Sequence, residues 1–249
     1  MRAGCARAAH PAAFSRTRRV VRNTKDHAGV GERMTTLALV GAGHIGSQIA
    51  RLGVARGYDV VVSNSRGPET LGELVAELGP SARAATVEEA ARAGDIVVVT
   101  IPFRSIESLP ADAFAGKVVV DTNNYYPQRD GHVAELDDES TTVSELLQRH
   151  LPDAHVVKAF NHIYSSAIVT DALPSGDPER RALAIAGDDA EAKAAVTALL
   201  DDFGFDAVDL GPLSEGWRVQ RETPAYGPRL TAPELRRAAA DAKRYRDMR

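Results

Sequence analysis

The chain has 249 residues but only one cysteine, Cys5, and one tryptophan. A single cysteine cannot form an internal disulfide, and no Cys or His spacing matches a zinc site, so we expect neither a disulfide-bonded fold nor a bound metal. No apolar run reaches the roughly 18 residues needed to cross a bilayer. These absences exclude a membrane-spanning role and favour a protein of the reducing cytoplasm.

The chain also has little net charge, −4, but this charge is unevenly distributed. Residues 1–33 carry eight Lys or Arg and only two acidic residues, which leaves −10 for the rest of the chain. An acidic body does not favour nucleic acid as a partner. The basic segment lacks the apolar region of a secretory signal, and Met34 directly precedes the first apolar run. We therefore expect residues 1–33 to be a disordered extension, or to lie upstream of the native start, and not to be a targeting segment.

From residue 36 onward, apolar runs alternate with segments of helical periodicity, which is typical of successive βα units. The predicted strands cover 36–40, 59–63, 82–85, 95–102, 117–121, 155–160, 181–187 and 205–210. The predicted helices cover 44–56, 68–78, 86–93, 142–150, 190–203 and 232–246. The fourth run is β-branched and apolar on both faces, as in the centre of a parallel sheet. The pattern predicts an α/β fold, a Rossmann-type doubly wound and mostly parallel sheet.

The most specific motif lies between the first predicted strand and helix, and it comprises Gly41, Ala42, Gly43, His44, Ile45 and Gly46. In such a Gly-x-Gly-x-x-Gly turn the first glycine permits the tight bend, the second lets a pyrophosphate approach, and the third lets the helix pack closely on the strand. The positive end of the helix then faces the phosphates. Glycine turns also arise for steric reasons alone, but the strand and helix around this one favour a dinucleotide site.

The end of the second predicted strand indicates which dinucleotide is bound. Proteins that bind NAD commonly carry an acidic residue there, which holds the ribose 2′-hydroxyl. This chain has Asn64, Ser65 and Arg66 instead, and an arginine suits a 2′-phosphate because it donates paired, charge-assisted hydrogen bonds. The alternative is a polar loop that caps the next helix. We favour NADP(H) as the cofactor.

The fourth predicted strand ends in Thr100, Ile101, Pro102 and Phe103, at the edge where open α/β sheets bind ligands. The side chains of Ile101 and Phe103 could form a wall of the nicotinamide site. Ordinary strand termination would explain the same residues equally well in the absence of the glycine motif.

Polar and aromatic residues follow the next two parallel strands, at 121–127 and 158–164, and we expect them to meet in one cleft for a second substrate. The candidates are Asn123, Tyr125, Asn161 and His162. His162 is a candidate general acid or base, and Asn161 a second catalytic candidate, although a lone histidine is more often a polar loop residue. Hydride transfer between two rings held face to face depends on positioning and needs no proton relay.

Four segments together resemble one family, the NADPH-dependent reductases of the deazaflavin coenzyme F-420. They are Gly41-Ala-Gly-His-Ile-Gly, Asn64-Ser-Arg, Val156-Val-Lys-Ala-Phe-Asn and Val208-Asp-Leu-Gly-Pro-Leu-Ser. The resemblance runs from about Met34 to Pro224. The same fold serves metalloreductases that reduce flavin, and its first half is similar to pyrroline-5-carboxylate reductases.

The resemblance implies an NADP-dependent oxidoreductase that passes hydride between NADPH and a small-molecule acceptor, coenzyme F-420 or a flavin. It implies an NADP-binding domain over 34–165 and a small carboxyl-terminal lobe over 166–249 that closes the cleft. It places Ser65 and Arg66 at the 2′-phosphate and Pro102 and Phe103 beside the nicotinamide. The residues that it implies for the deazaflavin pocket are Asn161, His162, Gly211, Pro212 and Leu213.

Two alternatives remain open. One is a non-catalytic module that senses NADP and regulates a partner, because fold alone does not establish catalysis. The other is an imine or pyrroline-5-carboxylate-type reductase, which would need an all-helical dimerising domain after the sixth strand. The predicted strands at 181–187 and 205–210 do not favour that domain. A homodimer is the default expectation for the oligomeric state.

Overall fold

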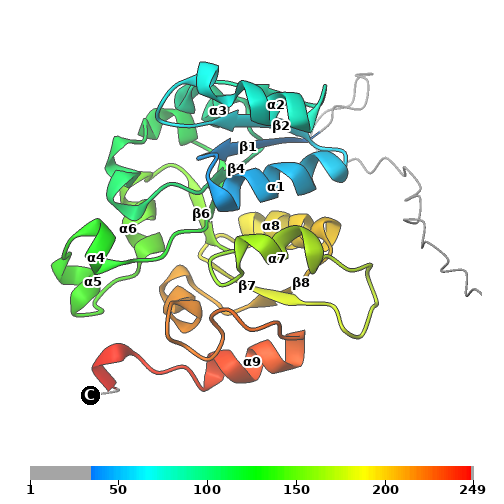
Figure 1. The fold of residues 1–249 in the computed structure, drawn as a ribbon. Coiled ribbons are helices and arrows are strands. Elements are labelled where there is room, and N and C mark those ends of the chain that lie inside the picture. The colour runs from blue at the N-terminus through cyan, green and yellow to red at the C-terminus, as the bar shows by residue number, and fades with distance from the viewer. Residues whose placement is uncertain (1–34, 248–249) are drawn as a thin grey trace, which may run out of the picture. The chain divides into compact units, whose positions relative to one another are not determined.

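A computed structural model of the protein describes residues 35–247 (Figure 1). The prediction of a disordered basic extension falls on residues outside this range. None of the helices in the described range is long and apolar enough to cross a membrane. The cytoplasmic location stays a prediction.

One eight-stranded sheet runs through the described part of the chain, in the order β3-β2-β1-β4-β5-β6-β7-β8. Its strands are β1 (Thr36–Val40), β2 (Asp59–Ser63), β3 (Ala82–Ala84), β4 (Ile96–Val99), β5 (Val118–Asp121), β6 (His155–Lys158), β7 (Ala182–Gly187) and β8 (Asp206–Asp209). The first six strands are parallel, β7 is antiparallel to β6, and β8 is parallel to β7. The predicted Rossmann-type, mostly parallel sheet is confirmed.

Helices cover both faces of this sheet (Figure 1). They are α1 (His44–Ala55), α2 (Gly72–Leu78), α3 (Val87–Ala93), α4 (Pro127–Asp130), α5 (Ala134–Asp137), α6 (Val143–His150), α7 (Ser165–Thr170), α8 (Ala190–Phe203) and α9 (Ala232–Ala240). Short 3-10 helices are η1 (Pro68–Leu71), η2 (Phe103–Ser108), η3 (Ala111–Phe114), η4 (Leu213–Val219) and η5 (Tyr245–Asp247). The three shortest α-helices, α4, α5 and α7, were not predicted from the sequence.

Alternate residues of each strand supply two separate cores, because successive side chains of a strand point to opposite faces. On β1, Leu37 and Leu39 pack with α1, α2 and α8, whereas Ala38 and Val40 pack with α3 and α6. A third, smaller cluster joins β7 and β8 to α9. The strands after β6 therefore extend the same sheet, while the proposed boundary near residue 165 stays a prediction.

The predicted helix over 232–246 is too long. α9 begins at the capping box of Thr231 and Glu234 and ends at Ala240. The chain then leaves the helix, and the backbone N–H groups of Tyr245 and Arg246 donate to the buried Glu139 carboxylate at 3.1 and 2.9 Å. Such N–H groups would be engaged within a continuing helix, so the tertiary contact with Glu139 replaces the last helical turns.

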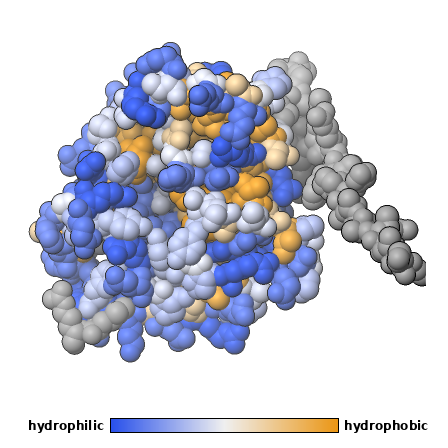
Figure 2. Space-filling view, in the orientation of Figure 1, coloured by the Kyte–Doolittle hydropathy of each residue, from blue (hydrophilic) through white to orange (hydrophobic). Residues whose placement is uncertain are grey.

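The face that carries α1 and α7 mixes apolar with polar residues (Figure 2). Within residues 35–247 the exposed large apolar side chains are Tyr164, at 60% exposure, and Val169, at 43%. Both lie on or next to α7. The expected homodimer stays a prediction.

Candidate functional site

Loops that follow the parallel strands gather at one edge of the sheet, which we call the carboxyl edge. β1 and β4 are neighbours although β2 and β3 separate them in sequence, so the chain changes direction across the sheet between them. Open α/β sheets bind their ligands outside the strand ends at such a switch point. The glycine turn and the segment after β4 both lie there.

Two of the three motif glycines are required by the packing of the turn. Gly41 has a φ of +110°, and its carbonyl oxygen accepts a hydrogen bond from Thr100 Oγ1 at 2.7 Å. A Cβ on Gly46 would lie 2.0 Å from the Gly41 carbonyl oxygen, so α1 can approach β1 only with glycine there. The turn is thus held against the end of β4.

Gly43 is different, because a Cβ on it would meet nothing within 4 Å. The residue is exposed and forms the N-cap of α1 without a side-chain cap, and the first turn of α1 has no acidic residue. His44 is also exposed, while Ala42 and Ile45 pack against the core. The N-terminus of this twelve-residue helix is therefore open to an anion, as a dinucleotide pyrophosphate requires.

In the loop after β2, one polar side chain forms hydrogen bonds within the loop, and two others are exposed. The Asn64 side chain accepts from the Arg66 backbone N–H at 2.8 Å and donates to Thr70 Oγ1 at 2.9 Å. Asn64 thus shapes the loop. The side chains of Ser65 and Arg66 are exposed at the carboxyl edge, where they fit the predicted 2′-phosphate site.

The segment after β4 corrects one predicted contact. Phe103 is only 6% exposed and packs in the second core, with its ring edge to face against Tyr125 at 6.0 Å between centroids. It cannot form an open wall, because η2 begins at this residue and turns the ring inward. Ile101, which is half-buried, and the exposed Pro102 remain as wall candidates.

The ends of β5 and β6 are joined by a buried ion pair. Lys158 Nζ lies 3.0 Å from Asp121 Oδ2, and the two side chains are 5% and 0% exposed. Ser144 Oγ also donates to Asp121 at 2.5 Å, and Lys158 donates to the Asn123 carbonyl oxygen. These bonds satisfy charges that would be costly to bury alone. The pair holds the ends of β5 and β6 together and so fixes the positions at which the following loops begin.

Three of the predicted substrate residues hold the loop after β5. The Asn161 amide donates to Asn124 Oδ1 at 3.1 Å and to the Val219 carbonyl oxygen at 2.8 Å. The Tyr125 hydroxyl donates to Asp137 at 2.8 Å, and its pKa is raised by burial and by that carboxylate. Asn123 is 6% exposed, and its Nδ2 atom has no protein partner.

His162 does not fit the expected general acid or base. It is 2% exposed, its Nε2 accepts from the Ala184 backbone N–H at 2.9 Å, and its Nδ1 lies 3.2 Å from the Ala225 carbonyl oxygen. Burial, followed by the positive charge of Arg181, lowers its pKa from 6.5 to about 4. Both ring nitrogens are engaged, so this neutral histidine ties the loop after β6 to β7.

The turn at Gly211, Pro212 and Leu213 is held against the end of β7. The Gly211 carbonyl oxygen accepts from the Gly187 N–H at 3.1 Å, and the Leu213 N–H donates to Asp188 Oδ1 at 2.9 Å. Gly187 itself pairs with Val157, next to the last residue of β6. The turn leads into η4, whose Gly216 lies beside the Lys158 side chain, and its role in binding an acceptor stays a prediction.

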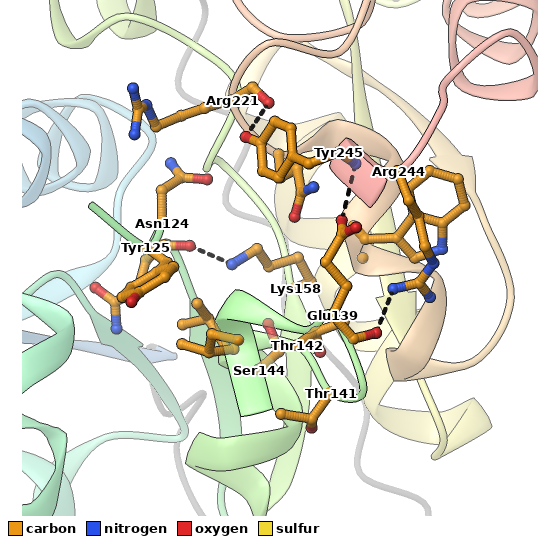
Figure 3. A pocket seen from close by; sticks show the side chains of 16 residues that line it. Asn124, Tyr125, Glu139, Thr141, Thr142, Ser144, Lys158, Arg221, Arg244 and Tyr245 are labelled. Atoms are coloured by element: carbon orange, nitrogen blue, oxygen red, sulfur yellow. Dashed lines mark hydrogen bonds between the residues drawn. The ribbon is translucent and has the colours of Figure 1, made fainter. Parts of the chain in front are cut away.

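A cavity of about 50 Å³ lies beside Lys158, and we call it the Lys158 cavity (Figure 3). Its lining is Asn123, Asn124, Tyr125, Leu136, Glu139, Thr141, Thr142, Val143, Ser144, Lys158, Gly216, Trp217, Gln220, Arg221, Arg244 and Tyr245. The polar runs predicted at 121–127 and 158–164 supply Asn123, Asn124, Tyr125 and Lys158 of this lining. No local motif could indicate the rest, since Glu139 meets the tail residue Tyr245 across 106 positions.

Within residues 35–247, no group of three or more His, Cys, Asp or Glu side chains is placed to hold a metal ion. The carboxyl edge offers an uncapped helix N-terminus at the glycine turn and hydrogen-bonded loops after β5 and β6. At the ends of β5 and β6, Tyr125, Lys158 and His162 are engaged in internal hydrogen bonds, whereas His44 of the glycine turn is exposed. This arrangement suits a reaction that depends on holding two ligands in place.

Comparisons with known proteins agree with this geometry. Residues 36–125 match the family model described as NADP oxidoreductase, coenzyme F420-dependent. A structure of a hypothetical protein from Sinorhizobium meliloti is 30% identical, with a TM-score of 0.69, over 80% of this chain and 96% of that one. A proposed F420-dependent NADP reductase from Arthrobacter sp. FB24 is 27% identical, with a TM-score of 0.61, over 72% and 86%.

Among curated proteins, the rat (Rattus norvegicus) metalloreductase STEAP3 is 32% identical over 82% of this chain. The match spans only 39% of that protein, and 53% of a second curated relative, from Escherichia coli, that is 40% identical over 29% of this chain.

Proposed function

Because the chain belongs to the family of NADP oxidoreductases described as coenzyme F420-dependent, as its motifs predict, we propose that it transfers hydride between NADPH and a deazaflavin or flavin acceptor. The observation that carries this proposal is the open glycine turn at the switch point. There, Gly41 and Gly46 are required by packing, whereas Gly43 leaves the N-terminus of α1 accessible.

In this proposal the backbone at Gly43 and the first turn of α1 hold the pyrophosphate, since their N–H groups and the helix dipole favour anions. Ser65 and Arg66 hold the 2′-phosphate, and both are exposed for that purpose. Ile101 and Pro102 border the nicotinamide. When bound, NADPH supplies the hydride.

The acceptor ring then lies on the side of Asn123 and Tyr125. The main contribution of the protein to catalysis is to hold the two rings in position. The Asp121–Lys158 pair and the Asn124–Asn161 amide contacts keep the two loops rigid. Rigid placement of two rings supplies catalysis without a dedicated acid or base. The internal bonds of His162 are consistent with such a mechanism.

The test is a stopped-flow experiment with the full chain, NADPH and each of three acceptors: coenzyme F-420, FMN and a small cyclic imine. The proposal predicts oxidation of NADPH that depends on protein, with F-420 or FMN reduced at the same rate. Turnover with the imine alone would support the imine reductase alternative. Tight NADPH binding without turnover of any acceptor would contradict catalysis and favour the sensor.

A further inference from the structure

Two residues that line the Lys158 cavity carry buried hydrogen-bond donors that the protein itself does not satisfy. Among the described residues, four buried side-chain atoms lack a partner, and two of them, Asn123 Nδ2 and Gln220 Nε2, belong to residues that line this cavity. Asn123 is more than nine-tenths buried. An unsatisfied buried donor costs roughly 1–3 kcal/mol, so a ligand that accepts from both amides would be stabilised.

The charged groups of the lining also favour an acceptor. Three cations line the cavity, Lys158, Arg221 and Arg244, against one carboxylate, Glu139. Both Glu139 carboxylate oxygens accept backbone N–H groups from the tail, which leaves that charge turned to the protein. Lys158 is paired with Asp121, and Arg221 lies 3.5 Å from Glu222. Arg244 is therefore the cation of the lining that pairs with no carboxylate within residues 35–247.

A helix end adds to this field. Residues 141–144, which lead into and begin the eight-residue helix α6, line the cavity. In the Thr142 capping box the Thr142 hydroxyl accepts from the Glu145 N–H, and the Glu145 carboxylate accepts from the Thr142 N–H at 2.7 Å, which leaves the N–H groups of Val143 and Ser144 without a partner within the helix. The positive end of the dipole favours an anion at this position.

The size and closure of the cavity restrict the ligand. About 50 Å³ accommodates a group of a few atoms, comparable with a few water molecules, and is far too small for a flavin ring. The carboxyl-terminal tail covers it, because Arg244 Nη1 donates to the Glu139 carbonyl oxygen at 2.9 Å and the Tyr245 hydroxyl donates to the Arg221 carbonyl oxygen at 2.6 Å. Figure 3 shows these contacts around the cavity.

We propose that the Lys158 cavity is a binding site for a small oxyanion, a carboxylate or phosphate group, received by Asn123, Gln220 and Lys158 beneath the carboxyl-terminal tail. The oxyanion is either a free ion or the end of a larger molecule. The site does not require the hydride transfer proposed above, because its donors are oriented by the protein alone.

The chain contains a built-in reporter for this site. Trp217 lines the cavity, and it is the only tryptophan of the sequence. Its ring is stacked by Arg218 and Arg244, each with the guanidinium carbon 4.6 Å from the ring centroid. An anion that engages Arg244 should therefore alter the fluorescence of the full-length protein.

The experiment titrates the full chain with inorganic phosphate and, separately, with acetate, at an ionic strength held constant with sodium chloride and without NADPH or acceptor. We expect a saturable change in Trp217 fluorescence with at least one of the two anions. Tighter binding of phosphate identifies a phosphate group as the natural ligand, and tighter binding of acetate identifies a carboxylate.

Variants with side chains of similar shape show whether the anion binds in the Lys158 cavity. Gln220→Glu and Asn123→Asp replace a donor by a repelling oxygen, and each should weaken binding at least tenfold. Gln128→Glu makes the same change at an exposed position on α4 and should bind as wild type does. Gln220→Met removes the donor without adding charge, which keeps the test available if Gln220→Glu does not fold.

Two results would overturn the proposal. One is the absence of any saturable change with either anion. The other is equal binding by wild type and both cavity variants, which would place the anion elsewhere. Neither result would bear on hydride transfer, because no nicotinamide is present.

Discussion

The glycine turn and the Lys158 cavity lie at the same end of the sheet but are built in opposite ways. The turn consists of six consecutive residues closed by one contact from Thr100. The cavity combines the loop after β5, the start of α6 and the end of β6 with η4 and the tail, which lie up to about half the chain apart. A site made of neighbours in sequence can be read from sequence, whereas a site made of distant residues depends on the whole fold.

The two sites also differ in what they require of each residue. Gly43 is important because its lack of a side chain leaves the N-terminus of α1 accessible. Asn123 and Lys158 are important for the hydrogen bonds that they form or could form with a ligand. A substitution at Gly43 should therefore weaken ligand binding without loss of stability. A substitution at the cavity should change both ligand binding and stability.

The sharpest contrast is between two glycines of one motif. Gly46→Ala places a Cβ 2.0 Å from a backbone oxygen and should destabilise the protein by about 5 kcal/mol, with loss of NADPH binding. Gly43→Ala meets nothing within 4 Å and should unfold at nearly the wild-type urea concentration while binding NADPH more weakly. Equal stability of the two variants would refute the assigned roles.

At the cavity, Lys158→Met should cost about 4 kcal/mol, because it leaves the buried Asp121 carboxylate without its cation. The double variant with Asp121→Asn removes both charges and should recover much of that loss. Urea denaturation of the wild type, both single variants and the double variant measures the coupling. Additive effects would mean that the pair contributes nothing.

The buried His162 predicts a dependence of stability on pH. Its pKa falls from 6.5 to about 4 on folding, so between these values the unfolded chain binds a proton that the folded protein excludes. Stability is therefore complete above pH 6.5 and is lost as the pH falls towards 4, by up to about 3 kcal/mol. The slope should be smaller in His162→Gln and unchanged in His44→Gln, an exposed position. Identical slopes in all three proteins would contradict this.

The smallest expected effect concerns the choice of nucleotide. Arg66→Gln should weaken NADPH binding about tenfold, roughly 1.4 kcal/mol, and leave NADH binding unchanged, because only NADPH carries the 2′-phosphate. Arg236→Gln, at an exposed position on α9, removes the same charge far along the chain and serves as the control. An equal loss for both nucleotides would indicate a general electrostatic effect.

The same contrast explains which features of the structure could be predicted from the sequence. The strands β1 to β6 and the glycine turn follow local rules of periodicity and turn chemistry, and the helix predicted from residue 86 begins at the capping box of Thr86. The inward turn of Phe103 and the internal bonds of His162 could not be predicted, because partners such as Ala184 and Ala225 lie far along the chain.

The direction of β7 is a second feature that could not be predicted from the sequence. Alternating elements predicted the strand but not that it runs antiparallel to β6, because the apolar pattern of a strand does not indicate its direction. The positive φ of Glu139, +58°, is likewise stabilised by its tail contacts and has no signature in the residues around it.

The most direct test of the account is the ratio of dissociation constants for NADPH and NADH, measured by titration calorimetry on the full chain. If the open glycine turn and the exposed Ser65 and Arg66 form one dinucleotide site, NADPH should bind at least about tenfold more tightly than NADH. Equal affinities, or tighter binding of NADH, would contradict the assignment of the carboxyl edge to NADP(H).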